Sequence, residues 1–514
     1  MIEATTAFLF IKDYANNGGD RYFVVEKDRL VEKNAKEIVT IAGVLVCHDF
    51  WLIAPALISQ AGTLPPLVVD VDEFQMMISG IKSIRHGREK KDVSRRNSFF
   101  EFDSELAKNY FLIWNRTVAI DEAVLFKFGI ALCGFWWVLE NAAREVGELD
   151  RFWLIEQPVA RYLTLASSRG IAIDQDRLRA HKKSIEHDYY SALKDFSNTY
   201  KVPLELPDDR DVIAYLEPLG FDFLGVDVEY VLRFVPMQDN YAEDLLLLRK
   251  LAASRNVLTA LPLARSRAYP LVNTFGSITS RIYYKDPALQ NLAKRHRDII
   301  VSDNGWVFCY VDYGQYEAGI MAALSSDPVL LDLYSNRDMY EEIAVRLFDD
   351  VGKRKNAKQL FLSYAYGMSL KSLVDACGNL GAIRQRAKEF FGGFDRFEKW
   401  KNEIWAECDL DRRIGTSLGN HVRFDSGSVL TAQERRSAIS QVVQGTASLI
   451  FKKALLSLSA LPDVELVLTM HDAVLVQIPS NADVSNLPKM FSDVMSDHFG
   501  GAVIGKAEVG QFFI

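Results

Sequence analysis

Two aspartates far apart in the chain sit at positions where apolar, strand-like runs end or turn. The segment Trp306–Glu317, WVFCYVDYGQYE, delivers Asp312 at the end of one such run. The segment Glu465–Ile478, ELVLTMHDAVLVQI, has two apolar runs around His471 and Asp472, which predicts a β-hairpin with its tight turn at the aspartate. If the strands are neighbours, the two carboxylates converge, and two magnesium ions about 4 Å apart could then support phosphoryl transfer. Taken singly, each aspartate also fits an ordinary strand-end or turn residue.

A basic segment lies between these two strands. In Lys353–Ser369, KRKNAKQLFLSYAYGMS, four residues are spaced by four: Arg354, Lys358, Leu362 and Tyr366. On an α-helix they form one stripe, with positive charge at its start and an aromatic ring at its end. A nucleoside triphosphate has the matching shape, because its phosphates would meet the cations and its base would lie toward the other end. A basic amphipathic surface helix is the alternative interpretation.

The elements that would position these groups differ along the chain. Residues 1–150 predict mixed α/β structure, with short β-prone runs at Tyr22–Val25, Ile38–Val46 and Leu67–Val71. From about Trp153 the pattern is helical, and two long helices are predicted to break at Gly170, with Asp174 capping the second. Residues 240–263 are again helical, and strands alternate with long helices after Gly276.

Composition excludes several classes. The 514 residues are 49% hydrophobic and 25% charged, which is typical of soluble globular domains, and the chain is long enough for two to four of them. The net charge of −8 neither supports nor excludes nucleic acid, because only the phosphate-binding groove must be positive. Five scattered cysteines without a CxxC pair argue against a disulfide framework or zinc site. No signal peptide or stretch of about 18 apolar residues suggests a membrane partner.

Together the segments resemble family A DNA polymerases, the bacterial DNA polymerase I family, over roughly residues 150–514. Their order is the family's order: DYxQxE, the RxxxK…YG helix, QGTA, then HD. Upstream, TSRIYYKDPALQN at Thr279–Asn291 resembles the family's TGRLSSSDPNLQN. The segment Arg435–Ser448, RRSAISQVVQGTAS, resembles the family's minor-groove helix.

The resemblance implies roles for individual residues. Asp312 and Asp472 would bind the two Mg²⁺ ions, for which Mn²⁺ can substitute, with the Tyr313 carbonyl as a further ligand. Glu317 would be the steric gate that excludes a ribose 2′-OH. The implied nucleotide-binding residues are Gln315, Glu317, Tyr340, Arg354, Lys358, Leu362 and Tyr366. The implied DNA contacts are Arg281, Gln290, Asn291, Arg436, Gln444 and His471.

Several positions depart from the family pattern. Leu362 stands where Phe or Tyr is usual, although Phe361 is adjacent, so stacking on the incoming base should be altered. Tyr340 replaces a phosphate-binding His, and Ala473 replaces the Glu of HDE. Gly419-Asn420-His421 stands where GRR is common, which suggests a lighter hold on the DNA backbone.

Residues 1–150 match the position and length of the family's 3′–5′ exonuclease domain. Such a domain needs Asp-x-Glu on its first strand, and AFLFIKDY has no such pair. Asp103-Ser104-Glu105 has the spacing but comes too late in the chain. The candidate remnants of the metal-binding residues are Asp70, Asp72 and Asp121. We therefore expect an exonuclease-like fold without nuclease chemistry, and no segment for a 5′-nuclease. The basic stretch Lys82–Arg96 fits either a solvated loop or a contact to DNA backbone.

The predicted fold is an α/β multidomain protein: a right-hand polymerase (palm, fingers, thumb) preceded by an RNase H-like 3′–5′ exonuclease-type domain. The predicted divisions are 1–150 exonuclease-like, 151–275 thumb, 276–330 palm, 331–410 fingers and 411–514 palm. The expected activity is DNA-templated addition of dNTPs to a primer 3′-OH, in replication or repair. Primer–template DNA and dNTPs are the expected partners of a monomer, with a helicase or processivity factor left open. The resemblance implies a cytoplasmic location, in a bacterial cell or phage-infected host.

Two other interpretations stay open. A related single-subunit RNA polymerase is the first, but Glu317 opposes it because such enzymes must admit the 2′-OH. A DNA-binding relic without activity would explain Ala473, Leu362 and the eroded exonuclease. The joint presence of Asp312 and Asp472 with the basic stripe opposes the relic.

Overall fold

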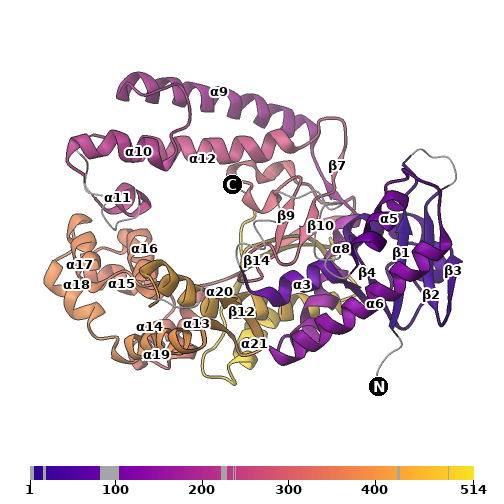
Figure 1. The fold of residues 1–514 in the computed structure, drawn as a ribbon. Coiled ribbons are helices and arrows are strands. Elements are labelled where there is room, and N and C mark those ends of the chain that lie inside the picture. Colours follow the sequence, from indigo (N-terminus) through magenta and orange to yellow (C-terminus); the bar gives the residue numbers. More distant parts are fainter. Residues whose placement is uncertain are drawn as a thin grey trace.

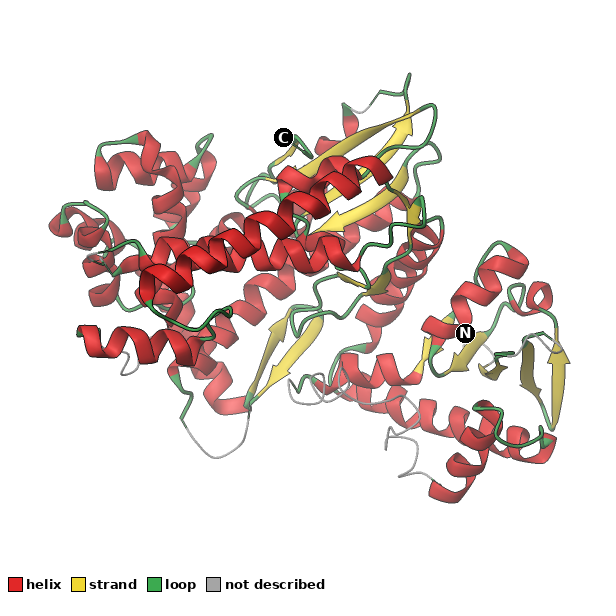
Figure 2. Cartoon of the chain, turned by 90° about the horizontal axis from the view of Figure 1, so that it is seen from above, coloured by secondary structure: helices red, strands yellow, loops and turns green. Residues whose placement is uncertain are grey.

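The computed structural model describes residues 5–14, 19–81, 103–221, 228–235, 237, 239–424, 429–483 and 485–513. Figure 1 shows an N-terminal sheet with its helices at one end of the molecule, α15–α18 at the other, and β10 and β14 between them. Figure 2 shows the strands of the N-terminal sheet set apart from those of the second sheet. The basic stretch Lys82–Arg96 lies outside the described residues.

The N-terminal sheet has the order β3-β2-β1-β4-β5, in which β1, β2 and β3 are antiparallel neighbours and β1, β4 and β5 run parallel. Along β1, Ala7, Leu9 and Ile11 join the core on one face, while Phe8 and Phe10 join the core on the other. This alternation follows from the two-residue period of a strand, so an almost wholly apolar strand is buried on both sides. The strands are β1 (Thr5–Ile11), β2 (Arg21–Glu26), β3 (Arg29–Lys33), β4 (Val44–Cys47) and β5 (Val68–Asp70).

Helices cover both faces of this sheet: α1 (Ala35–Ile38), α2 (Phe50–Ala61), α3 (Val71–Ser79), α5 (Ser104–Trp114) and α6 (Glu122–Glu145). The strand predicted over Ile38–Val46 is wrong in its first half. Asn34 forms a capping box with Glu37, which starts the short helix α1, and this helix ends at Ile38, the first residue of the predicted strand. The strand itself begins only at Val44.

One helix corrects the expectation about apolar stretches. By length and composition α6 could cross a membrane, and Lys127 is one of the few charges that interrupt it. Its Leu125, Phe128, Leu132 and Trp136 are buried against the N-terminal sheet. A core helix passes the same test, so this is weak evidence for a span.

The helical middle of the chain follows the predicted break. Helix α8 (Gln157–Ser168) ends before Gly170, whose φ of 69° is in the left-handed region, and Asp174 caps α9 (Gln175–Tyr200) through two backbone N–H groups. Helix α12 (Tyr241–Ala260) packs along α9. Around them lie α7 (Leu149–Arg151), the π-helical η2 (Phe152–Glu156), β6 (Ile171–Ala172), α10 (Asp209–Leu216), η3 (Glu217–Leu219), α11 (Val228–Phe234) and β7 (Arg267–Ala268).

A second sheet, of order β13-β14-β10-β15, forms the centre of the C-terminal half. Its strands are β10 (Trp306–Tyr313), β13 (Glu465–Met470), β14 (Ala473–Pro479) and β15 (Ala507–Val509). The long helix α20 (Ala432–Ser459), which begins with a Thr431–Glu434 capping box, belongs to the same hydrophobic core. The remaining short strands and 3-10 turns are β8 (Leu271–Asn273), β9 (Tyr283–Lys285), β11 (Arg413–Thr416), β12 (Gly419–Arg423), η4 (Leu289–Asn291), η5 (Lys294–Ile299) and η6 (Val351–Lys353).

The other helices of this half are α13 (Tyr316–Ser325), α14 (Pro328–Ser335), α15 (Met339–Phe348), α16 (Arg354–Ala365), α17 (Leu370–Asn379), α18 (Arg384–Phe391), α19 (Asp395–Asp411) and α21 (Asn486–His498). The divisions predicted at residues 150, 330 and 410 fall inside α7, α14 and α19. The domain boundaries therefore stay predictions.

Candidate active site

The two aspartates lie on neighbouring backbone positions, as the sequence predicted. Asp312 on β10 stands directly across from Ala473 on β14, and the N–H of Tyr313 donates to the carbonyl of Asp472 at 3.3 Å. The β13–β14 connection is a two-residue turn of His471 and Asp472, with His471 in the left-handed region at φ 56°. Histidine tolerates this conformation better than most residues. The strand and the turn thus bring both carboxylates to one edge of the sheet.

The electrostatics of this edge are unfavourable to two bare carboxylates. Burial raises the pKa of Asp312 to about 6, and the charge of Asp472 adds to the rise while Lys358 lowers it. Burial also raises the pKa of Asp472 to about 6, against the lowering effects of Arg281 and Lys358. A bound cation would stabilise the ionised form of both carboxylates. Within the described ranges, no group of three or more His, Cys, Asp or Glu side chains is arranged to hold a metal ion.

Four predicted site residues form one hydrogen-bonded chain beside the aspartates. Arg281 donates to Glu317 at 2.5 Å, and its guanidinium lies 3.9 Å from Asp472. The Tyr366 hydroxyl donates to the other oxygen of Glu317 at 2.5 Å. Burial, followed by the charge of Glu317, raises the pKa of Tyr366, so its hydroxyl keeps its proton. Gln444 on α20 donates to that hydroxyl at 3.5 Å. Glu317 is therefore held from two sides.

The basic stripe forms on α16 as predicted, with Tyr366 at its C-terminal end. Arg354 donates twice to Asp338, at 2.8 and 2.6 Å. The ring of Tyr340 is buried, and the Arg354 guanidinium and the Lys358 ammonium lie 5.7 Å and 5.6 Å from its centre. This ring fixes the two positive groups by cation–π contact.

Phe361 does not compensate for Leu362. Phe361 is fully buried and packs near the rings of Tyr340 and Phe394, so it points into the core. Leu362 is only partly buried. The neighbouring aromatic lies about 100° further round the helix, which is why adjacency in sequence does not place it on the stripe.

The remaining predicted residues differ in their contacts and exposure. Gln315 contacts the backbone of Arg337 and Met339, and so positions the start of α15. Gln290 is buried and accepts from the N–H of Tyr284. Asn291, Arg436 and His471 are exposed. Their predicted DNA contacts stay predictions.

Two acidic residues at this site were missed by the sequence reasoning. Glu508 on β15 stands directly across from Asp312 and contributes to the rise in its pKa. Asp338 both caps α15 and pairs with Arg354. The signal for Asp338 was present, because an aspartate just before a helical run is typical of an N-cap. The strand of Glu508 is too short for its period to be recognised.

The acidic residues weighed as nuclease ligands, among them Asp103, which comes too late in the chain, all lie at the starts of helices in this structure. Asp70 caps α3 and also accepts from the N–H of Phe50, while Asp103 and Asp121 cap α5 and α6. Asp72 is buried in the first turn of α3. β1 carries no acidic residue.

Comparison with known proteins places the chain in a family. The sequence model of DNA polymerase family A matches residues 229–510, more than half of the chain. DNA polymerase I of Chloroflexus aurantiacus is 24% identical over 69% of this chain and 42% of its own length. The thermostable DNA polymerase I of Thermus aquaticus is 25% identical, over 71% of this chain and 48% of its own length. DNA polymerase theta of Caenorhabditis elegans is 30% identical over 39% of this chain and 13% of its own length.

A solved structure shares the fold over nearly the whole chain. The POL domain of Pol1 from M. smegmatis, in complex with DNA primer-template and dNTP, aligns with a TM-score of 0.74 at 18% identity. The alignment covers 98% of this chain and 94% of that one. The chain spans less than half the length of the three relatives named above. With the family's motifs assembled around Asp312 and Asp472, this chain belongs to DNA polymerase family A.

Proposed function

We propose that this protein is a DNA-templated DNA polymerase that adds dNTPs to a primer 3′-OH by two-metal phosphoryl transfer. One observation carries the proposal: Asp312 and Asp472 meet at one sheet edge, within electrostatic reach of Lys358 on the basic stripe. The fold likeness to a polymerase domain solved with primer-template and dNTP supports it.

The donors at this edge suit Mg²⁺, with Mn²⁺ as a substitute. Hard cations prefer oxygen, and Mg²⁺ commonly takes one or two carboxylates together with substrate phosphates and water. Asp312, Asp472 and the Tyr313 carbonyl would supply the protein's oxygens. When bound, the two ions would activate the attacking hydroxyl and stabilise the leaving oxygen. The raised pKa values of both carboxyls, which burial causes first, support this assignment, because a bound cation offsets the cost of burying their charges.

The side chains around the carboxylates would align the reactants. Arg354 and Lys358 would bind the triphosphate, and Tyr340 would keep them in place. Glu317 would close the space beneath the sugar, so that deoxyribose is accepted and ribose is not. Arg281, Gln444 and the other predicted DNA contacts would hold the primer end through minor-groove acceptors that all correct base pairs share. Such positioning and charge neutralisation supply most of the rate enhancement in phosphoryl transfer.

The larger divisions follow the same proposal. The second sheet with α20 would be the palm, residues 331–410 with α15–α19 the fingers, and residues 151–275 with α8–α12 the thumb. The N-terminal unit would be an RNase H-like exonuclease-type domain, a proposal that the sheet order β3-β2-β1-β4-β5 with its mixed strand directions supports. Because β1 lacks acidic residues, proofreading would be absent. A cytoplasmic location, a monomeric state and a helicase or processivity partner stay expectations.

Primer extension tests the proposal. A labelled primer–template is incubated with Mg²⁺ and dNTPs, using wild type, Asp312→Ala and, as a control, Asp463→Ala, whose side chain is exposed in the turn before β13. We expect extension by wild type and the control only, and an intact primer when dNTPs are omitted. DNA binding without extension by the wild type would refute the polymerase and favour a relic. Equal use of rNTPs and dNTPs would favour an RNA polymerase. Shortening of the primer without dNTPs would refute the expectation that nuclease activity is absent.

A further inference from the structure

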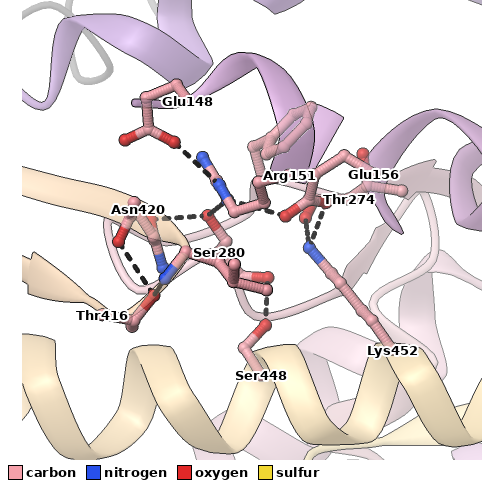
Figure 3. Close-up of polar contacts among 12 residues, drawn as sticks. Glu148, Arg151, Glu156, Thr274, Ser280, Thr416, Asn420, Ser448 and Lys452 are labelled. Carbon is pink, nitrogen blue, oxygen red and sulfur yellow. Dashed lines mark hydrogen bonds and ion pairs between the residues drawn. The ribbon is translucent and has the colours of Figure 1, made fainter. Parts of the chain in front are cut away.

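A buried polar network surrounds Ser280, the residue before Arg281 (Figure 3). Its hydroxyl donates to Asn420 Oδ1 at 2.9 Å and accepts from the Arg151 guanidinium at 3.3 Å. Its carbonyl accepts from the Ser448 hydroxyl at 2.6 Å. Side chains from α7, β12 and α20 therefore converge on one residue that is 1% exposed.

The charged members of this network are themselves fixed. Arg151 donates to Glu148 at 2.8 Å and to Glu156 at 2.7 Å, and the Lys452 ammonium contacts the second oxygen of Glu156 at 2.6 Å. All four side chains are at most 2% exposed. Buried charges persist only when paired in this way. Arg151 therefore presents a fixed donor to Ser280.

The backbone at Ser280 needs this support. Its φ is 58°, in the left-handed region that glycine adopts freely and that a residue with a Cβ occupies at a cost. The similar family motif, TGRLSSSDPNLQN, has glycine at this position. Serine at this position therefore carries the conformational cost that glycine avoids, and the side-chain contacts of Ser280 offset that cost.

A second departure from the family pattern lies in the same network. Asn420, in the segment where the family commonly has GRR, supplies the acceptor for Ser280, and its own carbonyl accepts from Gln441. The next residue, His421, lies 3.2 Å from Glu148. A Cβ on Gly419 would stand 2.5 Å from a Glu148 oxygen, so the segment is closely packed. The two departures are therefore parts of one arrangement.

This arrangement ends at the candidate active site. Arg281 directly follows Ser280, and its guanidinium holds Glu317 at 2.5 Å. We propose that Ser280 is a positioning residue: its hydroxyl, held by Arg151 and Asn420, fixes the left-handed backbone that directs Arg281 to Glu317, and thereby sets discrimination against ribonucleotides. The inference rests on the proposed polymerase function and on the gate at Glu317.

Single-nucleotide incorporation of a dNTP and the matching rNTP tests it, with the ratio of their kcat/KM values as the readout. The variants are Ser280→Ala, Ser280→Gly, Glu317→Ala as a positive control, and Ser254→Ala, a buried serine on α12 outside the network. We expect Ser280→Ala to reduce the ratio about five- to tenfold, the effect of losing roughly one hydrogen bond. Ser280→Gly should reduce it less, because glycine adopts the left-handed backbone without strain. Ser254→Ala should leave the ratio unchanged.

The outcomes separate the inference from the function on which it rests. A purely structural serine would lower the melting temperature of Ser280→Ala without changing the ratio. That result, together with a changed ratio in Glu317→Ala, would overturn the inference and leave the polymerase intact. If Ser280→Gly reduced the ratio as much as Ser280→Ala, the left-handed backbone would not be what connects Ser280 to Arg281. Absence of incorporation by the wild type would overturn the proposed function instead.

Discussion

The carboxylate of Asp312 is held at a place that disfavours its charge. Its pKa in the folded chain is about 6, above the ordinary 3.8, because of burial first and Asp472 second. Between these values the folded state binds more protons than the unfolded state, so the free energy of unfolding decreases as the pH rises from about 4 to 6. A divalent cation stabilises the charged form that burial disfavours, so its binding would offset this destabilisation.

Replacing Asp312 with Asn should therefore stabilise the metal-free protein. We expect a gain of about 1–2 kcal/mol at pH 7.5 that shrinks toward pH 5, after allowing for partial solvent screening. Mg²⁺ should raise the melting temperature of the wild type more than that of the variant. Thermal unfolding with EDTA or Mg²⁺ at both pH values measures this, and equal stability of the two proteins at every pH would contradict it.

At the scale of elements, local periodicity explains which predictions succeeded. Strand β10, the two-residue turn at Asp472 and the stripe on α16 each follow from a pattern within about a dozen residues. The network of Arg151 and Lys452 joins segments hundreds of residues apart, which no local period reveals. Its only signal was a charge within an apolar run, as at Lys452 in SLIFKKALLSL. Strand β4 begins at Val44, six residues later than predicted, and a helix capped by Asn34 occupies the first residue of the predicted run.

The two faces of helix α16 should differ in their effect on dNTP binding. Lys358 and Lys355 are both exposed, but Lys358 lies one turn from Arg354 on the stripe, whereas Lys355 is rotated about 100° away from Arg354. Lys358→Ala should raise the KM for dNTPs about ten- to a hundredfold, because a charge-assisted contact to phosphate is lost. Lys355→Ala removes the same charge from the same helix and should leave the KM unchanged. Steady-state incorporation kinetics decide this, and equal effects would show that only the overall charge of the helix matters.

At the scale of the whole molecule, the N-terminal unit shares a hydrophobic core and hydrogen bonds with the rest of the chain. Its core includes Phe152 and Phe275, which lie outside residues 1–150. Gln157 donates to the carbonyl of Pro66 at 2.9 Å, and the N–H of Arg423 donates to the carbonyl of Gly80 at 3.0 Å. Such contacts couple the two units during unfolding, even though each has its own sheet.

Glu148 also links the two units, because it contacts Arg151 and His421, and its charge is buried. Burial alone would raise its pKa, but Arg151, followed by His421, outweighs this and holds the pKa at about 2, so the group is ionised at neutral pH. We expect one calorimetric transition for the full chain. Glu148→Gln should lower the stability of that whole transition by about 3 kcal/mol, because Arg151 loses a buried partner. Glu145→Gln, an exposed neighbour at the end of α6, should change it by less than about 0.5 kcal/mol. Two resolved transitions, with Glu148→Gln shifting only one, would show instead that the N-terminal unit folds independently and that the links across this junction do not couple the two halves.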